Sequence, residues 1–193
     1  MQAGVAALLG GCAAVVMAPA VPIANGARDD KIITTLDEAS FTPAVRSTLL
    51  QARRVGLVVS DPWAIKLADL LEARGRYTLA IERPKTKVGD MTASERRETL
   101  RSVCNLPKRP ELALLGRINR VETGNASIAT LTGRTSIKNS WTLDILSCHN
   151  YTTQSIGGGF DMDVSTANAK STAELDEKMG VAMAEKVLKA LGR

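Results

Sequence analysis

The chain has 193 residues, and about 165 of them follow the first charged side chain, Arg28, which is enough for one domain with a hydrophobic core. Aromatic residues make up only 3% of the chain, too few to build the stacking surfaces that bind single-stranded nucleic acid. The net charge of +5 suits acidic partners or anionic lipid headgroups, and it equally suits a mildly basic solvated surface.

The opening of the chain carries no charged side chain and contains the stretch AALLGGCAA. Within it, the residues LGGC at 9–12 resemble the lipobox of bacterial lipoproteins, in which an apolar residue and two small residues precede a cysteine. The resemblance implies a leader over 1–11 that is cleaved off, and a lipid such as palmitate on Cys12. The alternative is an ordinary signal peptide that ends at Ala18 or Ala20. Either leader would export the protein.

The cysteine count agrees with export. The chain has three cysteines, and lipidation of Cys12 would leave Cys104 and Cys148 as an even pair. Thiols tend to pair in the oxidising compartments that exported proteins reach, so we expect a Cys104–Cys148 disulfide. Two buried free cysteines are the alternative, because cysteine is also a small hydrophobic residue.

The next segments predict a tether and then a strand–helix–strand unit. Residues 13–30 are rich in Ala, Pro, Asn and Gly, which predicts a tether over 12–45 with a short helix near Pro43. Residues 55–59 form an apolar run that predicts a buried strand, and 77–84 alternate like a second strand. Between them, Pro62 suits a first helical turn and Gly75 a helix end. The expected apolar stripe of this helix is Ile65, Ala68, Leu70 and Leu71.

The second half predicts a helix, a set of strands and a closing helix. Thr92 and Glu95 have the spacing of a capping box, which predicts a helix over 92–104. Residues 111–122 predict a strand, and the segments 126–134, 135–148 and 152–164 are β-rich. A long amphipathic helix follows, whose apolar stripe consists of Leu175, Met179, Met183, Val187 and Leu191.

This order predicts one α/β (α+β) domain over 46–193, with a mixed β-sheet flanked by helices and a closing C-terminal amphipathic helix. Three stretches, LADLLEARGRYTLAIERP, ELALLGRINRVE and LDEKMGVAMAEKVLKAL, resemble the fold shared by the curli-secretion lipoprotein, the lipoprotein activator of penicillin-binding proteins and the amino-terminal domain of TolB. The resemblance implies a CsgG/LpoB/TolB-N-like envelope domain without an active-site signature. The β-rich region is too short for the additional hairpins of a secretion channel.

Few residues suggest chemistry. His149 is the only histidine, so a hydrolase would have to pair it with Cys104 or a serine, but a polar strand-end histidine fits better. Residues 157–159 are three glycines without the lysine of a phosphate-binding loop, and they predict a hairpin turn or flexible loop. Asp161 and Asp163 share a strand face and could bind a cation, although two carboxylates are weak evidence. We therefore expect no metal site and no cofactor.

Two further motifs match the glycosylation acceptor pattern, at Asn125 and Asn150, and would matter only in a eukaryotic secreted protein. The sequence thus favours a non-catalytic envelope lipoprotein that binds another envelope component, such as a cell-wall synthase or an assembly factor. Ala13 follows the lipobox cysteine, and the resemblance then implies the periplasmic face of the outer membrane. The alternatives are an exported hydrolase and a periplasmic ligand-binding module. The sequence leaves the oligomeric state open.

Overall fold

The computed structural model describes residues 31–121, 134–165 and 172–192, so Cys12, Asn125 and most of the strand expected over 126–134 lie outside the described residues. In chain order the elements are β1 (Lys31–Leu36), α1 (Pro43–Gln51), β2 (Arg54–Val58), α2 (Pro62–Ala73), β3 (Thr78–Glu82), the 3-10 turn η1 (Val88–Asp90), α3 (Ala93–Cys104), β4 (Leu112–Val121), β5 (Arg134–Ser147), β6 (Thr153–Ser165) and α5 (Thr172–Leu191).

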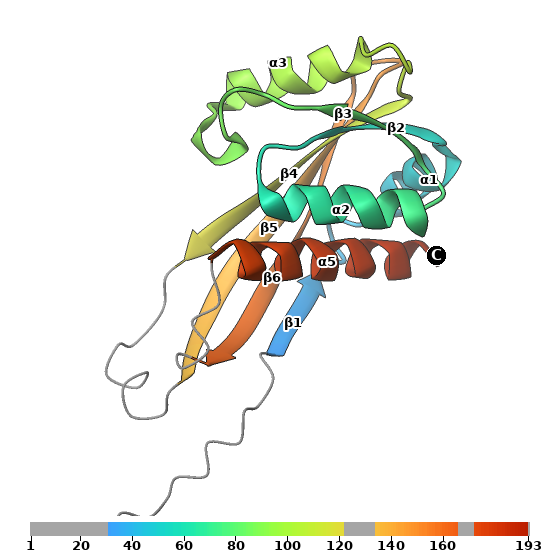
Figure 1. Ribbon diagram of the computed structural model, residues 1–193. Coiled ribbons are helices and arrows are strands. Elements are labelled where there is room, and N and C mark those ends of the chain that lie inside the picture. Colours follow the sequence, from blue (N-terminus) through green and yellow to red (C-terminus); the bar gives the residue numbers. More distant parts are fainter. Residues whose placement is uncertain (1–30, 122–133, 166–171, 193) are drawn as a thin grey trace, which may run out of the picture.

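The strands form one six-stranded sheet in the order β1-β6-β5-β4-β2-β3. Strand β2 runs parallel to β3 and β4, and the other neighbours are antiparallel. Helices α2 and α5 cover one face, whereas α3 lies at the other face beside β2 and β4 (Figure 1). The predicted mixed sheet with flanking helices and a closing amphipathic helix is confirmed.

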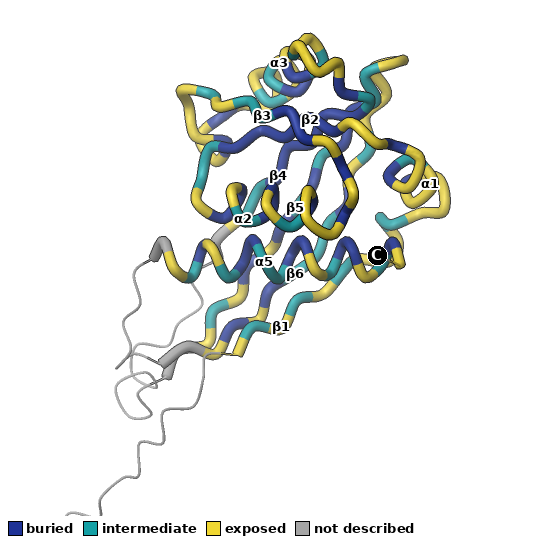
Figure 2. The backbone as a smooth tube through the Cα atoms, turned by 45° about the vertical axis from the view of Figure 1, so that its right-hand side comes forward, coloured by how far each residue is buried: buried dark blue, intermediate teal, exposed yellow. Residues whose placement is uncertain are grey.

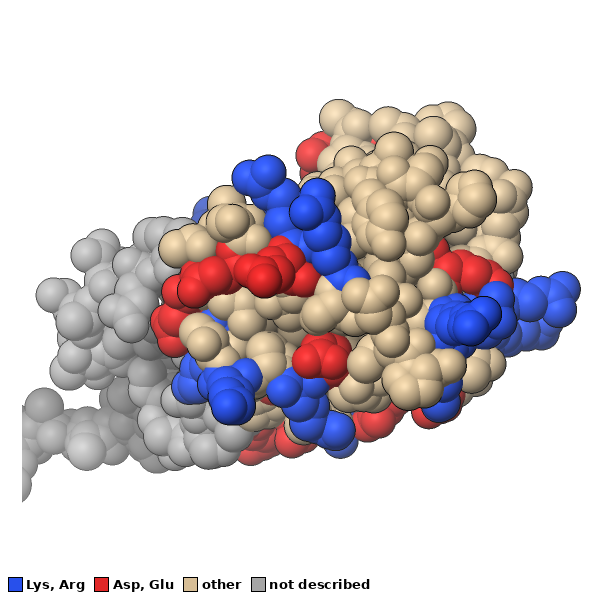
Figure 3. Space-filling model, turned by 90° about the horizontal axis from the view of Figure 1, so that it is seen from above, with Lys and Arg blue, Asp and Glu red and all other residues tan. Residues whose placement is uncertain are grey.

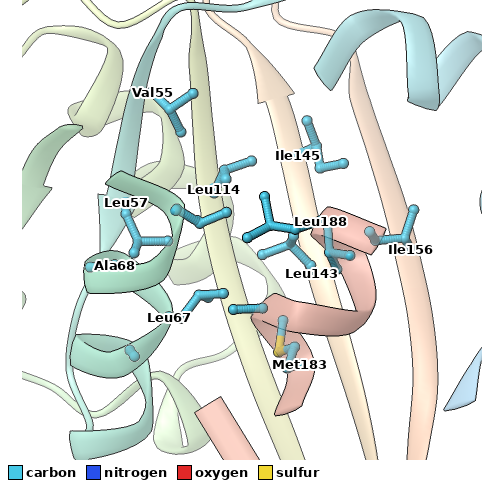
Figure 4. Close-up of a cluster of buried hydrophobic side chains, with 14 of the residues drawn as sticks. Val55, Leu57, Leu67, Ala68, Leu114, Leu143, Ile145, Ile156, Met183 and Leu188 are labelled. Carbon is cyan, nitrogen blue, oxygen red and sulfur yellow. The ribbon is translucent and has the colours of Figure 1, made fainter. Parts of the chain in front are cut away.

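The main core lies between the sheet and the α2–α5 layer. Figure 4 shows aliphatic side chains from β2, β4, β5 and β6 meeting those of α2 and α5. A second, smaller cluster lies on the opposite face, where Leu100 and Val103 of α3 pack on Leu115 and Leu146. The tube in Figure 2 is accordingly buried in the central strands and more exposed toward β1.

Helix α2 buries most of the apolar stripe predicted for it, with one exception. Its buried residues are Trp63, Ala64, Leu67, Ala68 and Leu71, whereas Ile65 is 46% exposed. Each helical residue turns the chain by about 100°, which places Ile65 on the far side of the helix from the stripe of Ala64, Leu67 and Leu71. Of the predicted stripe, Ala68 and Leu71 are buried and Leu70 is partly buried against the core, so the prediction was wrong at Ile65 and missed Trp63, Ala64 and Leu67.

Helix α3 begins as its sequence predicts. The Thr92 hydroxyl oxygen accepts a hydrogen bond from the Glu95 amide at 3.2 Å, and the Glu95 carboxylate accepts one from the Thr92 amide at 2.6 Å. The backbone hydrogen bond from Thr92 lowers the pKa of Glu95. The capping box is therefore complete.

Two segments of the sheet were not predicted as strands. Residues 31–36, expected within the tether, form the edge strand β1. The glycines at 157–159 are not a turn or loop but the middle of β6, between β1 and β5. A side chain at Gly158 would collide with the Thr35 carbonyl and the Trp141 ring, so the strand needs glycine there because its neighbours fill the space.

The apolar stripe of α5 is confirmed. Met179, Met183, Val187 and Leu191 are buried in the main core, and Leu175 is half-buried against it. The stripe spans the whole helix, because residues four apart lie on the same helix face.

Val187→Asp should therefore unfold the domain or lower its free energy of unfolding by about 3–5 kcal/mol, since it buries an unpaired carboxylate. Lys186→Ala, at the adjacent half-buried position, should change it by less than about 0.5 kcal/mol. Urea denaturation of both variants measures this difference. Equal midpoints for Val187→Asp and the wild type would contradict the assignment of the buried face.

Candidate functional site

A cleft of about 390 Å³ lies beyond the carboxyl end of β2, beside the continuing strand β4. Strand β2 stops at Val58, whose partner on β4 is Leu115, but β4 continues to Val121. Beyond Leu115, that edge of β4 has no strand neighbour within the described ranges. The cleft opens at the carboxyl ends of β2 and β3, where ligands bind in many α/β sheets. Its lining residues are Asp61, Pro62, Trp63, Lys87, Val88, Gly89, Asp90, Gly116, Arg117, Ile118 and Asp176.

Four segments build the cleft. Asp61 and Trp63 come from the start of α2, Lys87 and Asp90 from the connection after β3, residues 116–118 from β4, and Asp176 from α5. Because these segments are far apart in the chain, no local motif marks the site. The only sequence signal was that three of these segments follow or extend predicted strands.

Two glycines allow the start of α2 to lie close to both β4 and α5 at the cleft. A side chain at Gly116 would collide with the Trp63 ring, and Met183 Cε lies 3.6 Å from the position of that added carbon. A side chain at Gly180 on α5 would collide with the Trp63 backbone. The indole of Trp63, 5% exposed, is thus held between β4 and α5.

A short hydrogen-bond relay fixes the rim. The Ser60 hydroxyl donates to the Asp61 carboxylate at 2.6 Å, and the Ser60 oxygen accepts a bond from the Val88 amide at 3.2 Å. The β2–α2 junction is thereby joined to the connection that follows β3. Lys87 and Asp90 are exposed on that connection, whereas Asp176 is only 8% exposed.

Arg117 contributes a cation that is partly withdrawn from solvent. Its Nε lies 3.6 Å from an Asp144 carboxylate oxygen, and the two side chains are 25% and 15% exposed. The distance gives an ion pair without a hydrogen bond, so the buried Nε has no hydrogen-bond partner among the described residues. The ion pair with Asp144 is therefore the contact that holds this guanidinium beside the cleft.

The cleft is suited to recognition of mixed charge. Three carboxylates and two cations line it, and neither histidine nor cysteine is among the lining residues. Figure 3 shows basic and acidic side chains intermixed over the face seen from above, with no extended patch of one sign. Such a surface fits a partner that carries both charges better than a polyanion.

The Cys104–Cys148 disulfide expected from the sequence is present, with a Cα–Cα distance of 5.3 Å. It joins the end of α3 to the chain just after β5. His149 follows it and is exposed. Because the Cys104 sulfur is bonded to Cys148, the Cys104–His149 pair considered from the sequence does not form a nucleophile and base here.

The remaining candidates do not meet in a site. Asp161 and Asp163 lie on β6 opposite Lys138 and Ser136 of β5. Among the described residues there is no cluster of three or more His, Cys, Asp or Glu side chains that could hold a metal ion. The Asn150 side chain accepts a hydrogen bond from the Thr152 amide at 3.1 Å and so shapes the β5–β6 turn. No helix in the described ranges is both long enough and apolar enough to cross a bilayer.

Comparison with known proteins gives structural likeness only. No protein-family model and no curated protein matches the chain. Among solved structures, the PelC dodecamer from Paraburkholderia phytofirmans is 13% identical, with 83% of this chain and 97% of that chain covered and a TM-score of 0.45. A variant of the same PelC is 12% identical, covering 84% and 99%, with a TM-score of 0.42.

A candidate lipoprotein from Caulobacter crescentus CB15 is 13% identical, covering 77% of this chain and 92% of that chain, with a TM-score of 0.35. All three TM-scores are below 0.5, so the likeness transfers neither function nor assembly to this chain.

Proposed function

We propose that this protein is an exported, lipid-anchored protein of the cell envelope that binds another envelope component and catalyses no reaction. The observation that carries the binding role is the cleft, in which charges of both signs converge from four segments beside the unpaired part of the β4 edge. Such an edge can hydrogen-bond an extended peptide, while neighbouring side chains select its sequence. The partner would then be an envelope protein, such as a cell-wall synthase or an assembly factor.

The export half of the proposal rests on the cysteines. A disulfide between residues 44 positions apart is typical of proteins that mature in an oxidising compartment such as the periplasm. The LGGC sequence at 9–12 supplies a lipidation site at Cys12, and Ala13 after it fits the periplasmic face of the outer membrane. On this proposal the domain is also a relative of the CsgG, LpoB and TolB amino-terminal domains.

Cys12→Ala should move the protein from the membrane fraction to the soluble fraction, because the variant lacks the thiol that would carry the lipid. Intact mass spectrometry should find acyl chains on wild-type Cys12 and none on the variant. The anchor is contradicted if both proteins fractionate alike and no acyl mass is found on Cys12.

Lys87→Glu should weaken partner binding at least several-fold, because it reverses an exposed cation at the cleft without disturbing the core. Lys85→Glu is the matched control, since Lys85 is exposed on the same connection but lies outside the cleft lining. Both full-length variants should melt like the wild type. In-cell crosslinking followed by quantitative mass spectrometry should find the same neighbours for Lys85→Glu and the wild type, and fewer for Lys87→Glu.

Equal crosslinking of both variants would exclude the cleft as the binding site. The non-catalytic half fails separately if the folded protein turns over a peptide, ester or glycan and His149→Ala abolishes that turnover.

A further inference from the structure

Strand β1 presents an open edge. It pairs with β6 on one side, and no strand of the described residues pairs with its other side. The Asp37 amide donates to the Gly157 carbonyl at 2.8 Å, which continues the register of β1 with β6. Because backbone groups alternate in direction along an antiparallel strand, the odd-numbered residues bond to β6. The amides and carbonyls of Ile32, Thr34 and Leu36 therefore point to the open edge.

The residues of this edge are complementary to a second copy of themselves. If two β1 strands pair antiparallel about a two-fold axis at Thr34, Ile32 of one copy lies opposite Leu36 of the other. In the same register Ile33 meets Thr35, and Lys31 meets Asp37. The pairs are apolar with apolar, β-branched with β-branched and cation with anion, which are the favourable cross-strand combinations.

We propose that this chain forms a symmetric dimer through antiparallel pairing of its β1 strands, centred on Thr34, which joins the two sheets into one. The buried Thr34 Oγ1 has no hydrogen-bond partner among the described residues, and the facing Thr34 hydroxyl would supply one. Ile32 and Leu36 are half-buried against the core, and Ile33 is 46% exposed. Pairing would therefore also cover apolar surface that the monomer leaves in water.

The opposite edge of the sheet is unsuited to such pairing. The Thr78 amide bonds to the Arg53 carbonyl and Val59 bonds to the Glu82 carbonyl, so the Leu79 carbonyl faces away from β2. The Lys108 ammonium donates to that carbonyl at 2.7 Å. A lysine placed across an edge discourages strand addition. Two β1 edges can thus meet each other more readily than β1 can meet β3, which favours a closed dimer over an open chain of subunits.

The dimer is independent of the proposed lipid anchor and of the cleft, so either can fail without the other. Thr34→Cys in the full-length protein is the direct test. Across a hydrogen-bonded antiparallel pair the Cα atoms lie about 5.5 Å apart, within the range that a disulfide bridges. Mild oxidation should convert most of this variant to a covalent dimer on a non-reducing gel.

Thr35→Cys is the matched control. The two Thr35 residues would be offset by two positions, about 8 Å apart, and should stay uncrosslinked. Adding Lys31→Glu to Thr34→Cys should lower the crosslinked fraction several-fold, and adding Asp37→Lys as well should restore it. Crosslinking that is equal at both positions, or absent at both, would overturn the dimer.

The unmodified full-length protein provides a readout that does not depend on the variants. Its mass by sedimentation should be that of a dimer at micromolar concentration. A purely monomeric protein at tens of micromolar would likewise overturn the proposal.

Discussion

The arrangement of the molecule depends on the close approach of α5 to the first turn of α2. Gly180 lies against the backbone of Trp63, where a side chain of any other residue would overlap main-chain atoms that cannot move aside. Because the two helices are so close, Met183 extends to the space left by Gly116 on β4. Asp176, one turn before Gly180, reaches the cleft. A single small residue therefore positions both the core and one wall of the site.

The other face of the sheet is held differently. Helix α3 buries few apolar residues, and a disulfide from its end to the chain after β5 supplements that packing. Closing a loop of 44 residues stabilises the folded state by about 4 kcal/mol in the chain-entropy account. At the same corner, Glu111 accepts bonds from the Arg53 amide at 2.7 Å and the Arg54 amide at 3.4 Å. The hydrogen bond from the Arg53 amide is the main cause of the lowered pKa of Glu111. Local polar contacts thus fix the starts of β2 and β4.

The elements that the sequence predicted are those whose signal is local and repeated. The α5 stripe recurs every four residues, and the Thr92–Glu95 capping box needs no distant partner. The disulfide followed from the cysteine count and from the assumption of export. In each of these cases the residues that form the structural feature are the same residues whose types and spacing predict it.

The sequence did not reveal features whose cause lies elsewhere in the chain. Gly158 fits in the middle of a strand because the Trp141 ring and the Thr35 carbonyl of β1 occupy the space that a side chain would need. Strand β1 has no fully buried residue, and its sequence KIITTL does not alternate between apolar and polar residues. The cleft joins α2, β4, α5 and the connection after β3, so its lining became evident only when the topology was known. Ile65 shows the same limit within one helix, since a stripe that is right at Ala68 and Leu71 does not by itself exclude an apolar residue on the exposed side.

The close contact between α2 and α5 is tested most directly by the free energy of unfolding of Gly180→Ala, measured by urea denaturation. Gly89→Ala is the control. Intrinsic helix propensity favours alanine over glycine by about 1 kcal/mol, so without the Trp63 contact the variant would be more stable. The structure predicts the opposite sign, a loss of about 1–3 kcal/mol, because the added methyl group collides with the Trp63 backbone. Gly89 has open space around it, and its variant should unfold close to the wild type. A Gly180→Ala protein that is more stable than the wild type would contradict the close α2–α5 contact.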